Sequence, residues 1–394
     1  MKKIKWAALV FAILLILNAC GSHETPAPAE PSEPSETLET TETTEDTETM
    51  DSSESSKPSE ASEASEPAGS ASGDAASETQ DAAPQSDTSA DNDADVSDPA
   101  ASQESNDPLV YFTSDISAEG LVRIYESLGW DPQGKPAVKI STGEPPASNY
   151  LRPELIGDLV KTVDGTIVEC NTAYGGSRSS AAMHKQVAED HGFTAIADFD
   201  LMDEDGEVEW PMTGGSRLDK VIVGSHAENY SDWIILSHFK GHAMAGYGGA
   251  IKNVGIGISS PSGKVYVHTA GTQTSGSIWY DDQDAWLEAL AEMVLGFSNH
   301  VGAEHIIYIN VMNRLSVDCD CDGNPAEPDM HDIGILASTD PVALDQACID
   351  LVYQAPDSAS IVARIERQNG IHTLEHAEEI GLGSRTYELV NIDD

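Results

Sequence analysis

The sequence predicts an α/β fold with a mainly parallel sheet flanked by helices, preceded by a disordered acidic linker. Three observations support this prediction. Short apolar runs alternate with amphipathic stretches along residues 107–394, which is the order of strand and helix in parallel α/β sheets. Asp340 followed by Pro341 is a typical helix start, because Asp caps free N–H groups and Pro suits the first turn. Residues 21–106 contain no aromatic side chain, which is typical of a segment without a packed core.

The expected elements follow this alternation along the chain. Strands are expected at the short apolar runs, which are 109–112, 138–140, 166–168, 233–236, 305–311 and 333–337. Helices are expected at the amphipathic stretches, which are 118–128, 153–163, 180–190, 285–297 and 342–353. The 288 residues from 107 to 394 are enough for one large domain or for a domain with a lobe.

Residues 1–20 have the features of a bacterial lipoprotein signal peptide. Three lysines come first, and the apolar run from Trp6 to Leu17, which is short for a membrane span, precedes Cys20. Cys20 is therefore the expected lipidation site and the first residue of the mature protein. Its two acyl chains would anchor the protein to the cell membrane, facing the extracytoplasmic side. An uncleaved membrane anchor is the alternative.

Residues 21–106 are expected to form a disordered spacer. This stretch holds 23 Asp and Glu residues and one lysine among Ser, Thr, Ala and Pro. It cannot bury enough apolar surface to offset the conformational entropy that folding costs. Because its like charges repel one another, the spacer would hold the folded part away from the membrane.

The charge of the chain excludes some partners. The formal net charge of the whole sequence is −48, and residues 107–394 hold 16 basic against 45 acidic residues. A field of this sign disfavours nucleic acid and anionic lipid head groups and favours cations. We therefore expect no nucleic-acid partner, and contact with membrane lipid only through Cys20.

The segment from Ser237 to Gly257 concentrates the most potential chemistry. It places two histidines, two lysines and six glycines directly after the apolar run 233–236. A buried strand would thus deliver a flexible, cationic loop to the sheet edge, where glycine lets backbone N–H groups approach an anion closely. The segment is a candidate site for a small anionic ligand.

Three residues of this loop are candidate catalytic groups: His238, His242 and Lys252. Imidazole titrates near neutral pH, which suits acid–base catalysis, and the glycines before Lys252 let its ammonium and the backbone converge on one anion. The candidate cofactor contacts in the loop are Gly248, Gly249 and Asn253. The alternative is a closely packed Gly-rich crossover whose histidines bond to backbone carbonyls.

A second loop, from Glu169 to Arg178, joins the strand at 166–168 to the helix at 180–190. Glycines and hydroxyl side chains before a helix N-terminus suit an anion cradle, in which Arg178 would bind the anion through two N–H groups. Arg178 is therefore a further candidate for cofactor binding. An ordinary capped turn is the alternative.

Cys319 and Cys321 are the leading candidates for metal ligands. One residue separates them, a spacing that closes a disulfide only with strain. The surrounding carboxylates disfavour a thiolate nucleophile unless a cation is bound. Thiolates select iron, zinc or copper over calcium or magnesium, and His331 or Asp329 would complete the site. An acidic surface loop with two free thiols is the alternative.

Two further cysteines lie in the same part of the chain. Cys170 follows the strand at 166–168, at the edge where parallel sheets gather ligands, and is another candidate metal ligand. Cys348 lies within the helix expected at 342–353, where it is most simply a small core residue.

Three segments, 169–178, 237–257 and 318–345, resemble the domain of unknown function 362 (DUF362) family. The likeness covers nearly all of residues 107–394 and is most specific in Lys-Gly-His, Tyr-Gly-Gly-Ala-Ile-Lys-Asn and Asp-Pro-Val-Ala-Leu-Asp. Members are often described as associated with iron–sulfur centres, so the resemblance implies such a centre here. Some members carry a ferredoxin-like module, whose closely spaced run of cysteines is absent from this chain.

The segment from His242 to Lys252 also looks like the Gly-rich lysine segment of lactate-racemase-type proteins. In those proteins the lysine holds a nickel pincer cofactor and histidines move a proton or hydride. The resemblance implies that Lys252 anchors a cofactor or substrate and that His238 or His242 is the acid–base group.

Three functions are consistent with these residues. The first is a membrane-anchored redox protein or enzyme for a small anionic substrate, with an iron–sulfur cluster or a mononuclear transition metal as cofactor. The second is a non-catalytic lipoprotein that binds an anionic ligand in the Gly-rich loop. The third is a metal-free hydrolase or a racemase-like enzyme, which ranks lowest because no nucleophile-elbow motif is present.

Overall fold

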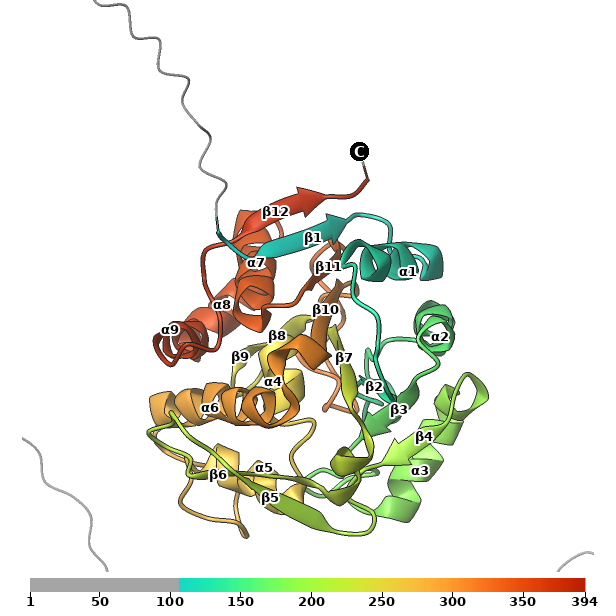
Figure 1. Cartoon of the computed structure of the whole chain (residues 1–394). Helices are drawn as coiled ribbons and strands as arrows, with labels where there is room; N and C mark the ends of the chain where they lie inside the picture. Colours follow the sequence, from blue (N-terminus) through green and yellow to red (C-terminus); the bar gives the residue numbers. More distant parts are fainter. Residues whose placement is uncertain (1–105, 394) are drawn as a thin grey trace, which may run out of the picture. The chain divides into compact units, whose positions relative to one another are not determined.

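A computed structural model describes residues 106–393, and Figure 1 labels their helices and strands. The predicted α/β fold with a mainly parallel, helix-flanked sheet is confirmed. The predicted signal peptide and linker lie outside the described residues, apart from Asn106.

An eight-stranded sheet has the order β12-β1-β11-β10-β7-β2-β3-β4. The strands of this sheet are β1 (Leu109–Thr113), β2 (Pro136–Lys139), β3 (Thr166–Glu169), β4 (Phe199–Leu201), β7 (Asp232–His238), β10 (Ile306–Met312), β11 (Gly334–Ser338) and β12 (Glu388–Asn391). Two separate hairpins are formed by β5 (Glu207–Pro211) with β6 (Lys220–Gly224), and by β8 (Lys240–His242) with β9 (Gly246–Gly248). The α-helices are α1 (Ala118–Ser127), α2 (Pro153–Thr162), α3 (Ala181–Asp190), α4 (Ala250–Gly255), α5 (Pro261–His268), α6 (Gln283–Val301), α7 (Pro341–Gln354), α8 (Ala359–Arg367) and α9 (His372–Glu379).

The strands of the large sheet run in one direction except β11, which is antiparallel to both of its neighbours, β1 and β10. The parallel pairs are β12 with β1, β10 with β7, β7 with β2, β2 with β3 and β3 with β4. Parallel neighbours end at the same edge of a sheet. The carboxyl ends of β7, β2 and β3 therefore lie together, and the functional site is built there.

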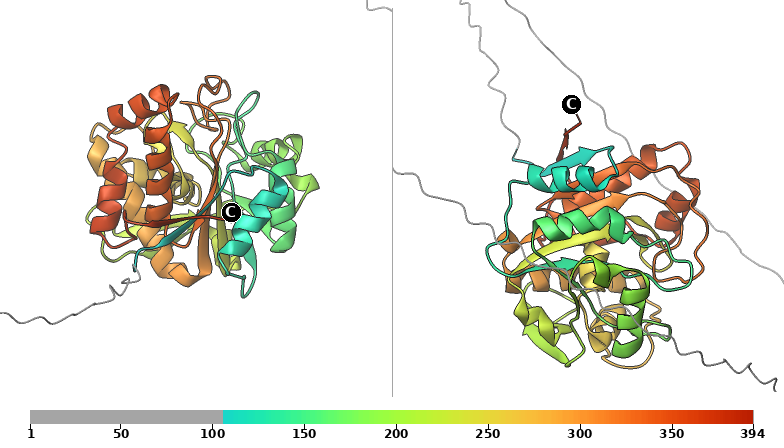
Figure 2. Two further views of the ribbon diagram at one scale, coloured as in Figure 1. Left: turned by 90° about the horizontal axis from the view of Figure 1, so that it is seen from above. Right: turned by 90° about the vertical axis from the view of Figure 1, so that its right-hand side faces the viewer.

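Helices cover both faces of the sheet (Figure 2), so its central strands are buried on both sides. Along β7, Ile234 and Leu236 belong to the apolar core that α1 and α2 share, whereas Trp233 and Ile235 belong to the core that α4, α6 and α7 share. Successive side chains of a strand point to opposite faces. The continuous apolar run that predicted a buried strand therefore supplies two cores at once.

The Gly-rich segment is ordered, whereas the sequence predicted a flexible loop. The hairpin β8–β9 comes first, and α4 begins directly after it at Ala250. Gly246 has a φ of +82°, and a Cβ on Gly241 would lie 2.2 Å from the carbonyl oxygen of Val317. The glycines therefore serve a turn and a close backbone approach, and the sequence alone did not reveal the chain packed against them.

Asp345 of α7 holds the N-terminus of α4. Its carboxylate accepts N–H groups of Ala250 at 2.8 Å and Ile251 at 3.0 Å, and the Asn310 amide at 2.7 Å. A Cβ on Gly249 would lie 2.3 Å from the same carboxylate, so glycine is required beside it. Burial raises the pKa of Asp345 to about 6, and its three hydrogen bonds oppose this rise.

Asn253 of α4 ties this helix to two neighbouring strands. Its Nδ2 donates to the carbonyl oxygens of Lys139 in β2 at 3.2 Å and Leu236 in β7 at 3.1 Å. Its Oδ1 accepts a hydrogen bond from Lys139 Nζ at 3.0 Å. Because Lys252 directly precedes Asn253, these bonds also fix the backbone from which Lys252 extends.

Some elements had no counterpart in the prediction. They are the hairpin β5–β6, the edge strands β4 and β12, and the helices α5, α8 and α9. Edge strands are short and need no continuous apolar run, which weakens their sequence signal.

The predicted cap is confirmed, because Asp340 accepts the N–H groups of Val342 and Ala343 at 2.8 and 2.9 Å. Within residues 106–393, no helix has both the length and the apolar character needed to cross a membrane.

We expect Asp345→Ala to lower the free energy of unfolding by about 3 kcal/mol, because three buried N–H donors would lose their acceptor. Denaturant unfolding followed by circular dichroism measures the change. Asp158→Ala is the matched control: Asp158 is exposed on α2 beside Lys161, so we expect a change below about 0.5 kcal/mol. Equal losses in both variants would contradict the role assigned to Asp345.

Candidate functional site

A cavity of about 410 Å³ lies at the carboxyl edge of the parallel strands. Three of its lining residues end neighbouring strands: Lys139 ends β2, Glu169 ends β3 and His238 ends β7. Ligand sites of parallel α/β sheets usually form at this edge. The Gly-rich segment and the loop around Cys319 and Cys321 complete the wall, so segments far apart in the sequence meet here.

The cavity is rich in positive charge. The acidic residues in its lining are Glu169 and Asp320. The lysine and arginine residues in its lining are Lys139, Arg178, Lys240, Lys252 and Lys264. Residues 107–394 as a whole are strongly acidic, with 16 basic against 45 acidic residues. The lining of the cavity is therefore opposite in charge to the domain as a whole.

Arg178, the predicted anion clamp, is already satisfied by the protein. It is buried, and it donates to Glu144 at 3.0 Å, Glu169 at 3.2 Å and the Tyr174 hydroxyl at 3.3 Å. Burial alone would raise the pKa of Glu169, but its contacts with His184 and Arg178 lower this pKa well below the usual value. Arg178 therefore supports the wall through ion pairs and has few donors left for a ligand.

Lys252 differs from the other four basic lining residues. Lys139, Arg178, Lys240 and Lys264 each donate to protein oxygens, whereas Lys252 makes no hydrogen bond or ion pair with residues 106–393. Burial and the charges of Lys240, Arg178 and Lys139 together lower its pKa to about 7, with the charge of Asp320 opposing them. Lys252 is thus a partly accessible amine that gains its charge most readily when an anion is present.

His238 is held on both sides of its ring. Nδ1 lies 2.9 Å from Asp320 Oδ1, and Nε2 lies 2.6 Å from the carbonyl oxygen of Asn313. Lys240 donates to the other oxygen of Asp320 at 2.9 Å. The charges of His238 and Lys240 hold the pKa of Asp320 far below its usual value, although burial alone would raise it. His238 therefore positions the loop around Asp320 and has no free nitrogen for acid–base chemistry in this arrangement.

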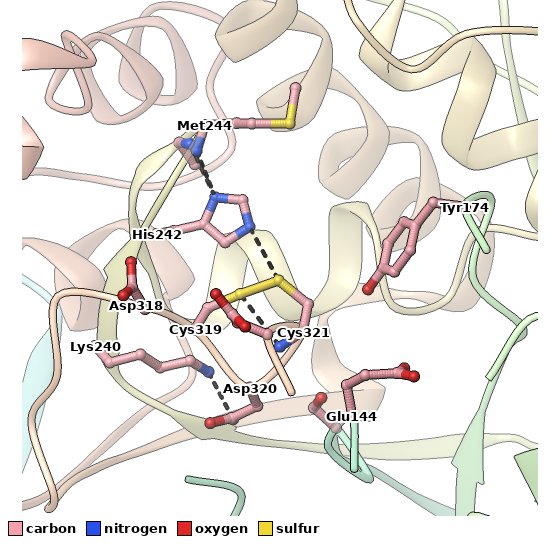
Figure 3. Close-up of a disulfide and its surroundings, with 12 residues drawn as sticks. Glu144, Tyr174, Lys240, His242, Met244, Asp318, Cys319, Asp320 and Cys321 are labelled. Atoms are coloured by element: carbon pink, nitrogen blue, oxygen red, sulfur yellow. Dashed lines mark hydrogen bonds and ion pairs between the residues drawn. A yellow bond between two sulfur atoms is a disulfide. The ribbon is translucent and has the colours of Figure 1, made fainter. Parts of the chain in front are cut away.

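Cys319 and Cys321 form a disulfide that closes over one intervening residue. The spacing of the two cysteines alone disfavoured this bond. The backbone of Val317 packs closely against Gly241, and Asp320 bonds to Lys240, so that the loop is held in a tight turn. His242 Nε2 lies 4.0 Å from Cys321 Sγ (Figure 3), and the three donor atoms of His242, Cys319 and Cys321 lie within 4.8 Å of one another. The domain thus contains a group of donors close enough to hold a metal ion.

The ring of His242 has a defined orientation (Figure 3). Its Nδ1 accepts the backbone N–H groups of Met244 at 3.2 Å and Ala245 at 2.9 Å. Burial and the charges of Lys252 and Lys240 place the pKa of His242 well below its usual value, so the ring is neutral. From these contacts we assign its single proton to Nε2, the atom that faces Cys321. A metal ion at Nε2 would have to displace this proton.

The other predicted metal ligands do not join this group. Cys170 lines the cavity, but its thiol donates to the carbonyl oxygen of Ile258 at 3.3 Å. His331 lies more than half exposed outside the cavity, and its Nδ1 is 2.7 Å from Asp357 Oδ1. The sequence could not show this pairing, because Asp357 belongs to the connection before α8.

An iron–sulfur cluster with four cysteine ligands does not fit the described residues. Cys348 is buried in α7 and accepts a hydrogen bond from Asn310 at 3.4 Å, away from the cavity lining. At most Cys170, Cys319 and Cys321 therefore face one space, and two of them are joined as a disulfide. A cluster of this kind needs four thiolates that converge.

Sequence reasoning missed several lining residues. They are Lys139, Lys264, His268, Trp279 and Asp320. The sequence did contain a signal for Lys139, because this charged residue interrupts the apolar strand expected at 138–140. It contained no comparable signal for Lys264 or His268 of α5. Burial lowers the pKa of His268 to about 4, and its Nδ1 lies 2.7 Å from the carbonyl oxygen of Lys264. His268 is thus a neutral ring whose Nε2 has no partner among residues 106–393.

Comparison with known proteins identifies one family. The family model described as domain of unknown function (DUF362) matches residues 137–350, which include all the residues that line the cavity. No curated protein matches the chain.

Two solved structures are similar in part. One is the lactate racemase apoprotein from Thermoanaerobacterium thermosaccharolyticum, with a TM-score of 0.38 and 13% sequence identity, covering 63% of this chain and 57% of that protein. The other is a Thermotoga maritima protein solved by a structural genomics consortium, with a TM-score of 0.35 and 10% identity, covering 66% of this chain and 58% of that protein. The chain therefore spans less than two thirds of either protein.

Proposed function

We propose that this chain, which belongs to the DUF362 family, is a membrane-anchored extracytoplasmic protein whose α/β domain binds a small anionic compound in the cationic cavity. The observation that carries this proposal is Lys252, an amine in the cavity wall with no protein acceptor among residues 106–393. A desolvated ammonium without an acceptor is costly, so a ligand oxygen there is stabilising.

The size and the charge of the cavity support the same class of ligand. A volume of about 410 Å³ is typical of a pocket for one small metabolite. The acceptors that Lys139, Lys240 and Lys264 use are mostly backbone carbonyls, which leave much of the positive charge uncompensated. A carboxylate or a phosphoryl group supplies the missing negative charge. His242 and His268, both neutral, are the groups that would exchange a proton with such a ligand if the protein is an enzyme.

A metal centre is the second candidate function, and the group of His242, Cys319 and Cys321 favours it. Two thiolates and one imidazole suit zinc, iron or copper. In this function the disulfide must first be reduced and the Nε2 proton of His242 displaced, with a fourth position left for substrate or water. The bound metal would act as a Lewis acid or as a redox centre beside the anion site.

We expect the affinity for a small anion to fall as the pH rises above about 7. The lowered pKa of Lys252 means that it is charged below about pH 7 and neutral above it. An anion stabilises the charged form, so binding takes up a proton, and above this pKa the affinity falls by up to about tenfold per pH unit. Burial and the charges of Lys240, Arg178 and Lys139 set this lowered pKa, and the charge of Asp320 opposes them.

Titration with sulfate and malonate, followed by the fluorescence of Trp279, measures this dependence. Trp279 lies at the cavity with 75% of its surface exposed, and Trp279→Phe identifies its signal. Lys252→Met should weaken binding at least about tenfold and remove the pH dependence above neutrality. Lys185→Met is the matched control, because Lys185 pairs with Glu204 on the exposed side of α3. Unchanged binding in Lys252→Met would refute the anion site.

The metal candidate has its own test. The reduced protein should bind about one equivalent of Co²⁺ with sulfur-to-metal absorption, whereas the oxidised protein should not. His242→Ala and Cys321→Ser should each weaken uptake at least about tenfold. Cys170→Ala should leave uptake unchanged, because Cys170 lies outside the donor group. Equal uptake by the oxidised and reduced proteins would rule out this centre.

The lipid anchor is tested by Cys20→Ser. The proposed diacylglyceryl group holds the protein in the membrane fraction. Without Cys20, the processed protein should move to the soluble fraction, whereas Cys170→Ala should not change the distribution. A Cys20→Ser variant that stays with the membrane would favour the uncleaved anchor at 6–17 instead.

A further inference from the structure

Each sulfur of the Cys319–Cys321 pair lies against an N–H donor. The backbone N–H of Cys321 donates to Cys319 Sγ at 3.3 Å, and His242 Nε2, to which we assigned the proton, lies 4.0 Å from Cys321 Sγ (Figure 3). A disulfide sulfur is a weak acceptor and a thiolate is a strong one. Both donors therefore stabilise the sulfurs after the bond has opened more than they stabilise the closed disulfide.

Two of the three acidic residues next to the cysteines pair with cations in the folded protein, and the third, Asp322, is exposed and accepts the Asn324 N–H. Asp318 pairs with Arg364 at 3.2 Å, and Asp320 pairs with Lys240 at 2.9 Å and with His238. These ion pairs compensate two of the charges that, judged from the sequence, disfavour a thiolate here. The fold turns these charges toward cations, and the sulfurs face the cationic cavity instead.

Access distinguishes Cys321 from the other cysteines that the structure describes. Cys170 and Cys348 are buried free thiols, and Cys319 is only 4% exposed. Cys321 is partly exposed and lines the same cavity as Lys252. A small nucleophile that enters the cavity therefore meets Cys321 first.

We propose that Cys319 and Cys321 form a redox-active disulfide that exchanges with small anionic thiols inside the cavity. The choice of an anionic thiol rests on the anion site proposed above, whereas the exchange itself rests on the sulfur contacts. Reduction at this centre is a two-electron step, and the thiol that enters is the reductant.

The exchange takes place in two displacement steps. A thiolate RS⁻ attacks Cys321 Sγ, the Cys319–Cys321 bond breaks, and its electron pair leaves on Cys319 Sγ, which accepts the backbone N–H of Cys321. A second RS⁻ attacks the substrate sulfur of the mixed disulfide, and Cys321 leaves as a thiolate that accepts the His242 N–H. Two RS⁻ are thereby oxidised to RSSR, and the protein disulfide is reduced to two thiolates, which take protons from solvent.

The test uses the full chain in detergent, with mercaptoacetate as the anionic thiol and cysteamine as a cationic thiol of similar size. Thiols are trapped with a maleimide, and the two adducts on the peptide with Cys319 and Cys321 are counted by mass spectrometry. Rates are divided by those of each thiol with 2-hydroxyethyl disulfide, which removes differences in intrinsic reactivity. We expect mercaptoacetate to react at least about tenfold faster than cysteamine without unfolding of the protein, and Lys252→Met to abolish this preference.

His242→Ala tests the contact with sulfur. In buffers of mercaptoacetate and its disulfide, this variant should shift the equilibrium toward the protein disulfide by about tenfold, the effect of one hydrogen bond to a charged group. His226→Ala is the matched control, because His226 bonds to Asp200 and Asp205 outside the cavity lining. It should leave the equilibrium unchanged.

Two results would overturn the exchange proposal while leaving the anion site intact. One is labelling of Cys319 and Cys321 only at denaturant concentrations that unfold the protein. The other is an equilibrium that His242→Ala and His226→Ala leave equally unchanged. Fast exchange without any charge preference would instead overturn the choice of an anionic thiol, and the anion site with it.

Discussion

Burial of several amines at the carboxyl edge of one parallel sheet is the constraint on which the site depends. A lysine taken out of water needs an acceptor or loses its charge. Lys139, Lys240 and Lys264 meet this requirement with backbone carbonyls, Asn253 and Asp320. The loops that carry these acceptors are thereby tied to the ends of β2 and β7.

Contacts from two sides hold the Gly-rich segment in place. Asn253 bonds to both β2 and β7, and Asp345 binds the first N–H groups of α4 from the other side. Gly249 is the residue that lets the carboxylate of Asp345 come so close. Lys252 is thus held in place by its neighbours, while its own amine makes no hydrogen bond or ion pair with residues 106–393.

The loop around Cys319 and Cys321 depends on the same cations. Asp320 lies between the two cysteines in the sequence, yet its side chain faces His238 and Lys240. From its place in the sequence, Asp320 would disfavour thiolates at the two neighbouring cysteines. In the fold it binds His238 of β7 and Lys240 of β8 instead, and so holds the loop against these strands. The sulfurs are left facing His242 and the cavity.

Much of the fold was predictable from the sequence alone. The apolar runs at 109–112, 166–168, 233–236 and 305–311 predicted strands, and the sequence Asp340-Pro341 predicted the start of α7, because local periodicity and capping reflect burial and free N–H groups directly. The sequence also singled out Lys252, His242, Cys319 and Cys321 as members of a site, and the structure brings all four to one cavity. Only the tertiary structure decided their states. Arg178 pairs with two glutamates, His331 lies beside Asp357, the disulfide is closed, and Lys252 has no hydrogen-bond or ion-pair partner among residues 106–393. These states depend on neighbours that only folding brings together, and no local pattern encodes such contacts.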